Sequence, residues 1–144
     1  MFILDSDHLS LLQREETDEF RRLADRISAY SAELFFVTII SFHEQMNGWT
    51  AYVARAKDSV LLVRGYAELD GILSDFARAQ VLPFSAAAAD IYDDLKKRKI
   101  RVGAMDLRIA SIAIAHQMTV LTRNTVDFER IPNLSFEDWT IHST

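Results

Sequence analysis

Residues 102–139, VGAMDLRIASIAIAHQMTVLTRNTVDFERIPNLSFEDW, are the stretch of the chain that decides the fold. An acid, Asp106, stands at the head of an almost wholly apolar segment of helical length, and a short β-type run over residues 119–122 follows it. A polar turn then leads to a second acid, Asp127. Neither a buried helix nor a central strand needs a charge at its end. The stretch therefore predicts two core elements, with two carboxylates that would suit a metal ion.

Outside this stretch, short apolar runs and amphipathic segments alternate along the chain. Apolar, β-branched or aromatic composition predicts further strands over residues 2–4, 34–40, 81–84 and, more weakly, 133–139. One helix is predicted to start near Ser6 or Asp7. Helical spacing of apolar residues predicts further helices over residues 15–30, 41–58, 60–78 and 85–99. Because Pro83 has no N–H to donate, its strand belongs at a sheet edge or a strand end.

Strands separated by helices predict the α/β class, with a central, mostly parallel, twisted sheet and helices on both faces. The chain has 144 residues, which fits a single domain over 1–144. Its hydrophobic share of 49 % is enough for a real core. The segment after Asp106 is apolar on nearly all sides, so we expect that helix to be buried all round.

Composition narrows the class of protein. There is no cysteine, which rules out disulfides and thiolate metal sites and fits a cytoplasmic protein. The N-terminus lacks the basic start of a signal peptide, and no segment reaches the ~20 apolar residues of a membrane span. The net charge of −5 argues against a general nucleic-acid coat protein, so any contact with RNA or DNA must use a local basic patch or metal ions.

Several acids fall where a parallel sheet would gather them. Asp5 closes the first strand, Glu44 follows the second, and Asn124 and Asp127 follow the fourth, while Asp106 begins a buried helix. The carboxyl ends of strands in open α/β sheets meet at one crevice. Two bare carboxylates about 4 Å apart repel by about 4 kcal/mol at an effective dielectric constant of about 20. Hard oxygen ligands without cysteine favour Mg²⁺ or Mn²⁺, and such an ion suits phosphodiester cleavage.

Each acid also has a purely structural interpretation. Asp5 is suited to capping the helix that follows it, and Ser41-Phe42-His43-Glu44 matches a capping box. Asp106 and Asp127 each fall in a first helical turn, where a negative charge complements the helix dipole. Together, four acids at predicted element ends favour a shared site over four separate caps.

The chain resembles PIN-domain proteins, and more closely the VapC-type toxins of type II toxin–antitoxin pairs. The resemblance rests on ILDSD near the start, SFHE, VGAMDLRIASIAIA and LTRNTVDFERIPNLSFEDW, and so spans nearly the whole chain. It implies a three-layer α/β/α PIN-like fold and a Mg²⁺-dependent endoribonuclease, with Mn²⁺ as a substitute. The matching positions imply that Asp5, Glu44 and Asp106 are the core catalytic and metal-binding acids and that Asp127 is the fourth, more variable one.

The resemblance also implies helpers and partners. Asn124 would be a nearby polar helper, and Ser6 and Asp7 stand where relatives commonly have Thr-Asn, so Ser6 keeps a hydroxyl and Asp7 adds charge. Relatives are commonly homodimers and bind a small cognate antitoxin along a hydrophobic groove, which we expect here within residues 15–75.

Basic residues near the acids have two interpretations each. The run over residues 94–101 carries Lys96 to Lys99 and Arg101, which suits either RNA phosphates or an ordinary solvated helix end. Arg108 and Arg123 lie closer to the acids in sequence and would pair with the acids or with phosphate. The four histidines show no metal-binding spacing and are expected to be structural.

Three other functions remain open. A haloacid-dehalogenase-like phosphatase would use Asp5 and Asp7, but Leu9 stands where that family has Thr or Val. A PIN-type nuclease acting on another nucleic acid, such as DNA, would keep the same chemistry. A non-catalytic PIN binding module would have lost at least one acid, whereas all four are present.

Overall fold

A five-stranded, wholly parallel sheet is the centre of the computed structural model, which describes residues 1–14 and 17–142. Its strand order is β3-β2-β1-β4-β5. The strands are β1 (Phe2–Leu4), β2 (Phe35–Thr38), β3 (Val81–Leu82), β4 (Thr119–Leu121) and β5 (Ser135–Glu137). In register, Phe2 of β1 lies opposite Phe35 of β2 and Thr119 of β4. The predicted α/β sandwich is confirmed, and β3, the strand that precedes Pro83, is an edge strand.

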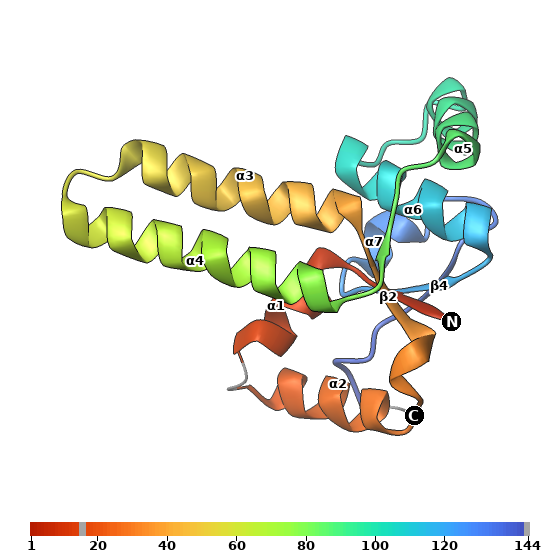
Figure 1. Cartoon of the computed structure of the whole chain (residues 1–144). Coiled ribbons are helices and arrows are strands. Elements are labelled where there is room, and N and C mark those ends of the chain that lie inside the picture. The colour runs from red at the N-terminus through yellow and green to blue at the C-terminus, as the bar shows by residue number, and fades with distance from the viewer. Residues whose placement is uncertain (15–16, 143–144) are drawn as a thin grey trace.

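Helices connect successive strands and cover both faces of the sheet (Figure 1). They are α1 (Ser6–Arg14), α2 (Asp18–Ser28), α3 (Ile39–Arg55), α4 (Ser59–Arg78), α5 (Ala86–Lys97), α6 (Ala104–His116) and α7 (Thr125–Phe128), with a 3-10 turn over Ala32–Leu34. The predicted helix over residues 15–30 corresponds to α2, and residues 15–16 lie outside the described part. Figure 1 shows α3 and α4 as an antiparallel hairpin that projects from the body of the molecule.

Two hydrophobic cores lie on opposite faces of the sheet, because successive strand residues point to opposite sides. In β1, Ile3 belongs to the core beneath α5 and α6, and Leu4 to the core beneath α2 and α4. Val120 and Leu121 of β4 divide in the same way. The strands are therefore apolar on both faces, as central parallel strands must be.

Helix α6 is buried along most of its length, as its sequence predicts. Leu107, Ile109, Ala110, Ile112 and Ala113 are all at most 5 % exposed, and they pack against strand residues such as Ile3 and Val120. The helix ends at Gln117, which adopts a left-handed conformation with φ 55° and whose N–H reaches the carbonyls of Ala113 and Ile114. This rigid placement fixes the N-terminal turn of α6, which carries Asp106.

Helix α3 begins earlier than the sequence predicts. It starts at Ile39, and the side chain of Thr38 accepts a hydrogen bond from the Ser41 N–H at 3.2 Å. Ser41 is therefore inside the helix, and the predicted capping box of Ser41 with Glu44 is wrong. Thr38 is the last residue of β2 and takes the cap position because its hydroxyl faces the free amides of the first turn. None of the helices in the described part of the chain is long and apolar enough to cross a membrane.

Candidate active site

Asp5 is the most buried acid at the carboxyl edge of the sheet, with 5 % of its surface exposed. It follows β1, and its N–H continues the ladder by donating to the Leu121 carbonyl at 2.9 Å. One carboxylate oxygen accepts from the Ser6 N–H at 2.8 Å, and the other accepts from the Thr122 hydroxyl at 2.8 Å. Burial first, and then the charge of Asp7, raises the pKa of Asp5 from 3.8 to about 7 despite these two donors.

Glu44 is brought next to Asp5 by α3. The Ser6 hydroxyl, one residue after Asp5, lies 3.0 Å from Glu44 Oε1 and 3.0 Å from the Ser41 hydroxyl. Ser41 is fully buried and stands one helical turn before Glu44 on the same face. The start of α1 and the first turns of α3 are therefore tied together directly beside Asp5.

Asp106 and Asp127 are joined through a single side chain. The Asn124 amide nitrogen donates to Asp106 Oδ2 at 3.1 Å and to Asp127 Oδ2 at 3.0 Å. Asp106 stands in the first turn of α6 and Asp127 in α7. Burial raises the pKa of Asp106, and the negative charges of Glu44 and Asp127 raise it further.

The predicted acids lie within electrostatic reach of one another at the carboxyl ends of the strands, where open α/β sheets form a crevice. Asp106 is affected by the charges of Glu44, Asp127 and Asp7, and Asp5 by those of Asp7 and Asp106. Within residues 1–14 and 17–142, no three acidic or histidine side chains stand close enough to form a ready-made set of metal ligands. Carboxylates repel one another and turn toward nearby donors. Asp106 and Asp127 both accept from Asn124, and Asp127 Oδ1 also lies 3.8 Å from the guanidinium group of Arg130.

The donor chemistry of the crevice fits a hard divalent cation. Carboxylate oxygens come from Asp5, which follows β1, and from Glu44, Asp106 and Asp127 in α3, α6 and α7, with no sulfur ligand among them. Burial contributes most to the raised pKa values of Asp5 and Asp106, and the charges of neighbouring carboxylates raise both further, while hydrogen bonds rather than cationic side chains lower them. A cation would supply the missing charge, and rotation of the side chains on fixed backbones would bring their oxygens toward it.

The predicted helpers have different positions. Ser6 and Asn124 bond directly to the acids, as described above. Asp7 is one-third exposed, and its Oδ2 accepts from the Arg123 backbone N–H at 3.0 Å. The guanidinium group of Arg108 lies 5.6 Å from the centre of the Tyr92 ring, and in the described residues neither Arg108 nor Arg123 pairs with an acid through its side chain.

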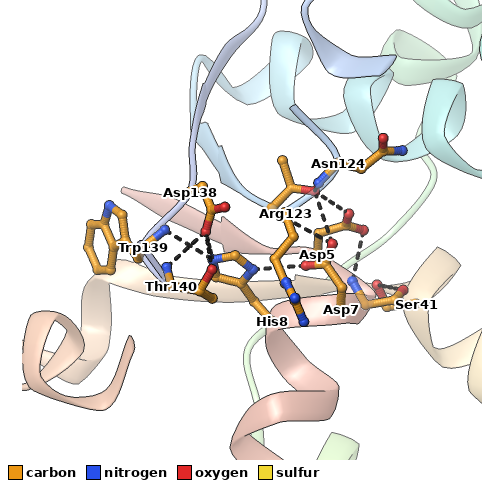
Figure 2. A network of polar contacts seen from close by, with 11 residues as sticks. Asp5, Asp7, His8, Ser41, Arg123, Asn124, Asp138, Trp139 and Thr140 are labelled. Carbon is orange, nitrogen blue, oxygen red and sulfur yellow. Dashed lines mark hydrogen bonds and ion pairs between the residues drawn. The ribbon is translucent and has the colours of Figure 1, made fainter. Parts of the chain in front are cut away.

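Three polar residues that the sequence analysis does not assign to the site also belong to it. Thr122 is fully buried and donates to Asp5, while its oxygen accepts from the Asn124 N–H at 3.0 Å. Ser41 supports Ser6. His8 is fully buried beside Asp7 (Figure 2). For Thr122, the signal in the sequence is a hydroxyl at the end of a predicted core strand, next to the polar turn.

The family model of the PIN domain matches residues 3–134, a range that contains all four acids. The chain belongs to the PIN-domain family. Over 133 residues it is 31 % identical to the VapC ribonuclease Y4jK of Sinorhizobium fredii, a match that covers 90 % of this chain and 91 % of that protein. Over 77 residues it is 39 % identical to ribonuclease VapC2 of Rickettsia felis, covering 51 % of this chain and 55 % of that protein.

Solved structures of PIN-domain toxins have the same fold. One chain in the crystal structure of VapBC2 from Rickettsia felis, bound to a DNA fragment from its promoter, superposes with a TM-score of 0.67 and 26 % identity. The match covers 96 % of this chain and 98 % of that chain. This PIN-domain chain spans about half the length of the first curated relatives that it matches.

Proposed function

We propose that this PIN-domain chain is a metal-dependent endoribonuclease of the VapC type, acting as a single catalytic unit over residues 1–144. The observation that supports this proposal best is that four carboxylates lie at one edge of the sheet, carried by the end of β1 and by α3, α6 and α7. The charges of Glu44 and Asp127 add to burial in raising the pKa of Asp106, and the charge of Asp106 adds to the rise at Asp5. The family and the names of its relatives, which include ribonucleases, agree with that chemistry.

The four acids would divide the work by their positions. Asp5, which is held by Ser6 and Thr122, is the fixed ligand at the base of the crevice. Asp106 and Asp127 act together because Asn124 bridges them, and Glu44 faces them from α3. When bound, Mg²⁺ or Mn²⁺ would supply Lewis-acid chemistry, which makes water a better nucleophile and stabilises charge on the phosphate oxygens.

The remaining side chains bind and orient the RNA. Arg123 is exposed on the turn that carries Asn124, and Arg108 is part of α6 close to Asp106 in sequence. Neither guanidinium group is engaged by an acid in the described residues, so both remain available for phosphate oxygens. Lys96 lies over the Tyr92 ring at 5.2 Å, beside Arg108 on the same aromatic side chain, and extends this basic surface.

A protein partner would control the enzyme. Helix α4 exposes large apolar side chains, including Val60, Val63, Tyr66 and Leu73. A cavity of about 340 Å³ lies between α3 and α4 and is lined by Phe42, Met46, Tyr66, Leu69, Asp70 and Leu73. We propose that apolar surfaces of this kind hold a small cognate antitoxin and a second copy of the chain in a homodimer.

The proposal is tested by comparing the purified wild-type chain with Asp5→Asn on RNA and on DNA of the same sequence. We expect Mg²⁺-dependent cleavage of RNA by the wild type, no cleavage by Asp5→Asn, and loss of cleavage in EDTA that added Mg²⁺ or Mn²⁺ restores. Sequencing of the cleaved ends identifies the substrate. Full activity of Asp5→Asn, or unchanged activity in EDTA, would refute the mechanism. Preferential cleavage of DNA would show that DNA, not RNA, is the substrate.

The antitoxin is tested separately. We expect the product of a small gene directly upstream to copurify with this chain and to block cleavage. Val63→Glu should weaken that complex without changing the cleavage rate of the free protein, because Val63 is exposed in the first turns of α4, at the end of the hairpin far from Glu44. Retained binding by this variant would exclude the α4 surface as the docking site.

A further inference from the structure

His8 connects the acidic crevice to the segment that follows β5. Its ring is fully buried, and its two nitrogens face different kinds of partner (Figure 2). Nδ1 lies 2.8 Å from Asp7 Oδ1, and Nε2 lies 3.3 Å from the backbone N–H nitrogen of Trp139. Asp138 Oδ1 is farther from Nε2, at 3.9 Å, and accepts from the backbone N–H and the hydroxyl of Thr140 instead. A backbone N–H can only donate, so Nε2 must accept, and the proton of a neutral ring is then on Nδ1, facing the carboxylate.

The Trp139 N–H is held firmly in place. The Trp139 side chain is 1 % exposed and packs against the rings of Phe2, Tyr30 and Phe35. Its indole N–H donates to Glu137 Oε2 at 2.8 Å, and the guanidinium group of Arg26 lies 4.7 Å from the ring centre. His8 therefore has a rigid donor on one side, which determines its tautomer and its ring orientation.

On the other side, Asp7 transmits this order to the site. With Oδ1 bonded to His8, its Oδ2 accepts from the Arg123 N–H at 3.0 Å and lies 3.4 Å from the Thr122 hydroxyl. The turn over residues 122–124 carries both the Thr122 hydroxyl that bonds to Asp5 and the Asn124 amide that bridges Asp106 and Asp127. Without His8, the partly exposed Asp7 carboxylate could rotate away from that turn.

We propose that His8 is a positioning residue of the acidic crevice. As the Nδ1–H tautomer it fixes the Asp7 carboxylate, and through Asp7 it fixes the turn that aligns Asp5, Asp106 and Asp127. A core histidine with a purely structural role needs only satisfied nitrogens. His8 instead makes one of its two hydrogen bonds to the Asp7 carboxylate, whose other oxygen holds the active-site turn. The part of the inference that concerns metal affinity rests on the proposed function.

The tautomer is tested directly in the wild-type protein, without metal and without a variant. Two-bond ¹⁵N–¹H correlation spectra of the imidazole ring distinguish the Nδ1–H from the Nε2–H tautomer and from the doubly protonated ring. We expect Nδ1–H for His8, with a ring proton that exchanges slowly with water because the side chain is buried. Either of the other two forms would overturn the inference.

Two isosteric variants separate the two bonds of the ring. In His8→Asn, the amide nitrogen stands at the place of Nδ1 and keeps the donor to Asp7. In His8→Gln, the amide stands at the place of Nε2 and keeps a partner for the Trp139 N–H but loses the donor to Asp7. Each variant loses one buried hydrogen bond, so thermal unfolding should move by a similar amount in both.

A purely structural role and a positioning role then predict different results. We expect His8→Gln to speed hydrogen exchange at the Arg123 amide and to raise the dissociation constant for Mn²⁺, measured by calorimetry, by roughly 10- to 100-fold. His8→Asn should keep both values near those of the wild type. Equal effects of the two variants would overturn the inference. Failure of the wild type to bind Mn²⁺ would instead refute the proposed function, and the Arg123 exchange comparison would still decide the role of His8.

Discussion

Asp5 has a strongly raised pKa in the folded protein, mainly because its carboxyl group is buried. Its pKa of about 7 in the folded protein exceeds 3.8, so as pH rises the unfolded chain releases this proton first. The metal-free protein should therefore lose stability between about pH 4 and pH 7, and a pKa difference of this size corresponds to about 4 kcal/mol. Asp5→Asn should remove most of this loss. The loss is measured by urea unfolding of both proteins in EDTA at pH 4.5 and pH 8, which are roughly the two sides of this window. If the stability of both proteins changes with pH in the same way, the loss does not come from Asp5.

Thr122 gives a second prediction at the residue scale. Thr122→Val has nearly the same shape but leaves the Asp5 carboxylate and the Asn124 N–H without their shared partner. We expect a loss of about 1–3 kcal/mol in the free energy of unfolding and a higher Mg²⁺ concentration for half-maximal cleavage. Thr122→Ser keeps the hydroxyl and is the control. If both variants require the same Mg²⁺ concentration as the wild type, Thr122 has no part in orienting Asp5.

Single residues show how far the sequence alone can reach. It was predictable that Asp5, Glu44, Asp106 and Asp127 lie near one another, because each follows or begins a recognisable element and a parallel sheet brings such ends together. His8 was not, because its partner Trp139 is 131 positions away and no local pattern reveals that contact. Arg108 was left between two interpretations, and its place over Tyr92 depends on the packing of α5 on α6, which spacing does not determine.

Helix caps give the prediction at the scale of elements. Thr38 caps α3, which carries Glu44, while Asp58 caps α4 through a 2.9 Å bond to the Leu61 N–H at the far end of the hairpin. Each cap changed to alanine should lower the free energy of unfolding by about 1 kcal/mol. Of the two variants, only Thr38→Ala should also raise the Mg²⁺ concentration needed for cleavage, because α3 carries a site residue and α4 does not. An equal Mg²⁺ requirement in both variants would separate Glu44 from metal binding.

Most elements were predictable from periodicity and composition, and their ends were less so. The helix after Asp106 was recognisable because apolar residues cover all of its sides, and the structure buries it accordingly. The start of α3 was predicted at Ser41 because Ser41 and Glu44 match a capping box, yet Thr38 takes that position. Two competing hydroxyls three residues apart cannot be ranked from sequence, since the geometry at the end of β2 decides which one faces the free amides.

At the scale of the whole molecule, the crevice should couple metal binding to stability. Any ligand that binds only the folded state stabilises it, by about 2.7 kcal/mol at a hundredfold excess over its dissociation constant. Protons compete for Asp5, so Mg²⁺ should raise the melting temperature more at pH 8 than at a pH of about 5.5, below the folded-state pKa of Asp5. Differential scanning calorimetry with Mg²⁺ and with EDTA at each pH measures this effect. Asp5→Asn should show little Mg²⁺ response at either pH, and a full response in that variant would place the ion elsewhere.

The position of β1 between β2 and β4 has a consequence for how the protein is made. The ribosome synthesises β1 and Asp5 well before the partners that complete their surroundings, which come from β4, the 122–124 turn and Trp139. A nascent chain therefore holds its acids apart until most of its length has been translated. Such a chain would gain the proposed nuclease activity only near the end of its own synthesis, and until then it would be harmless to the messenger and to the ribosome that produce it.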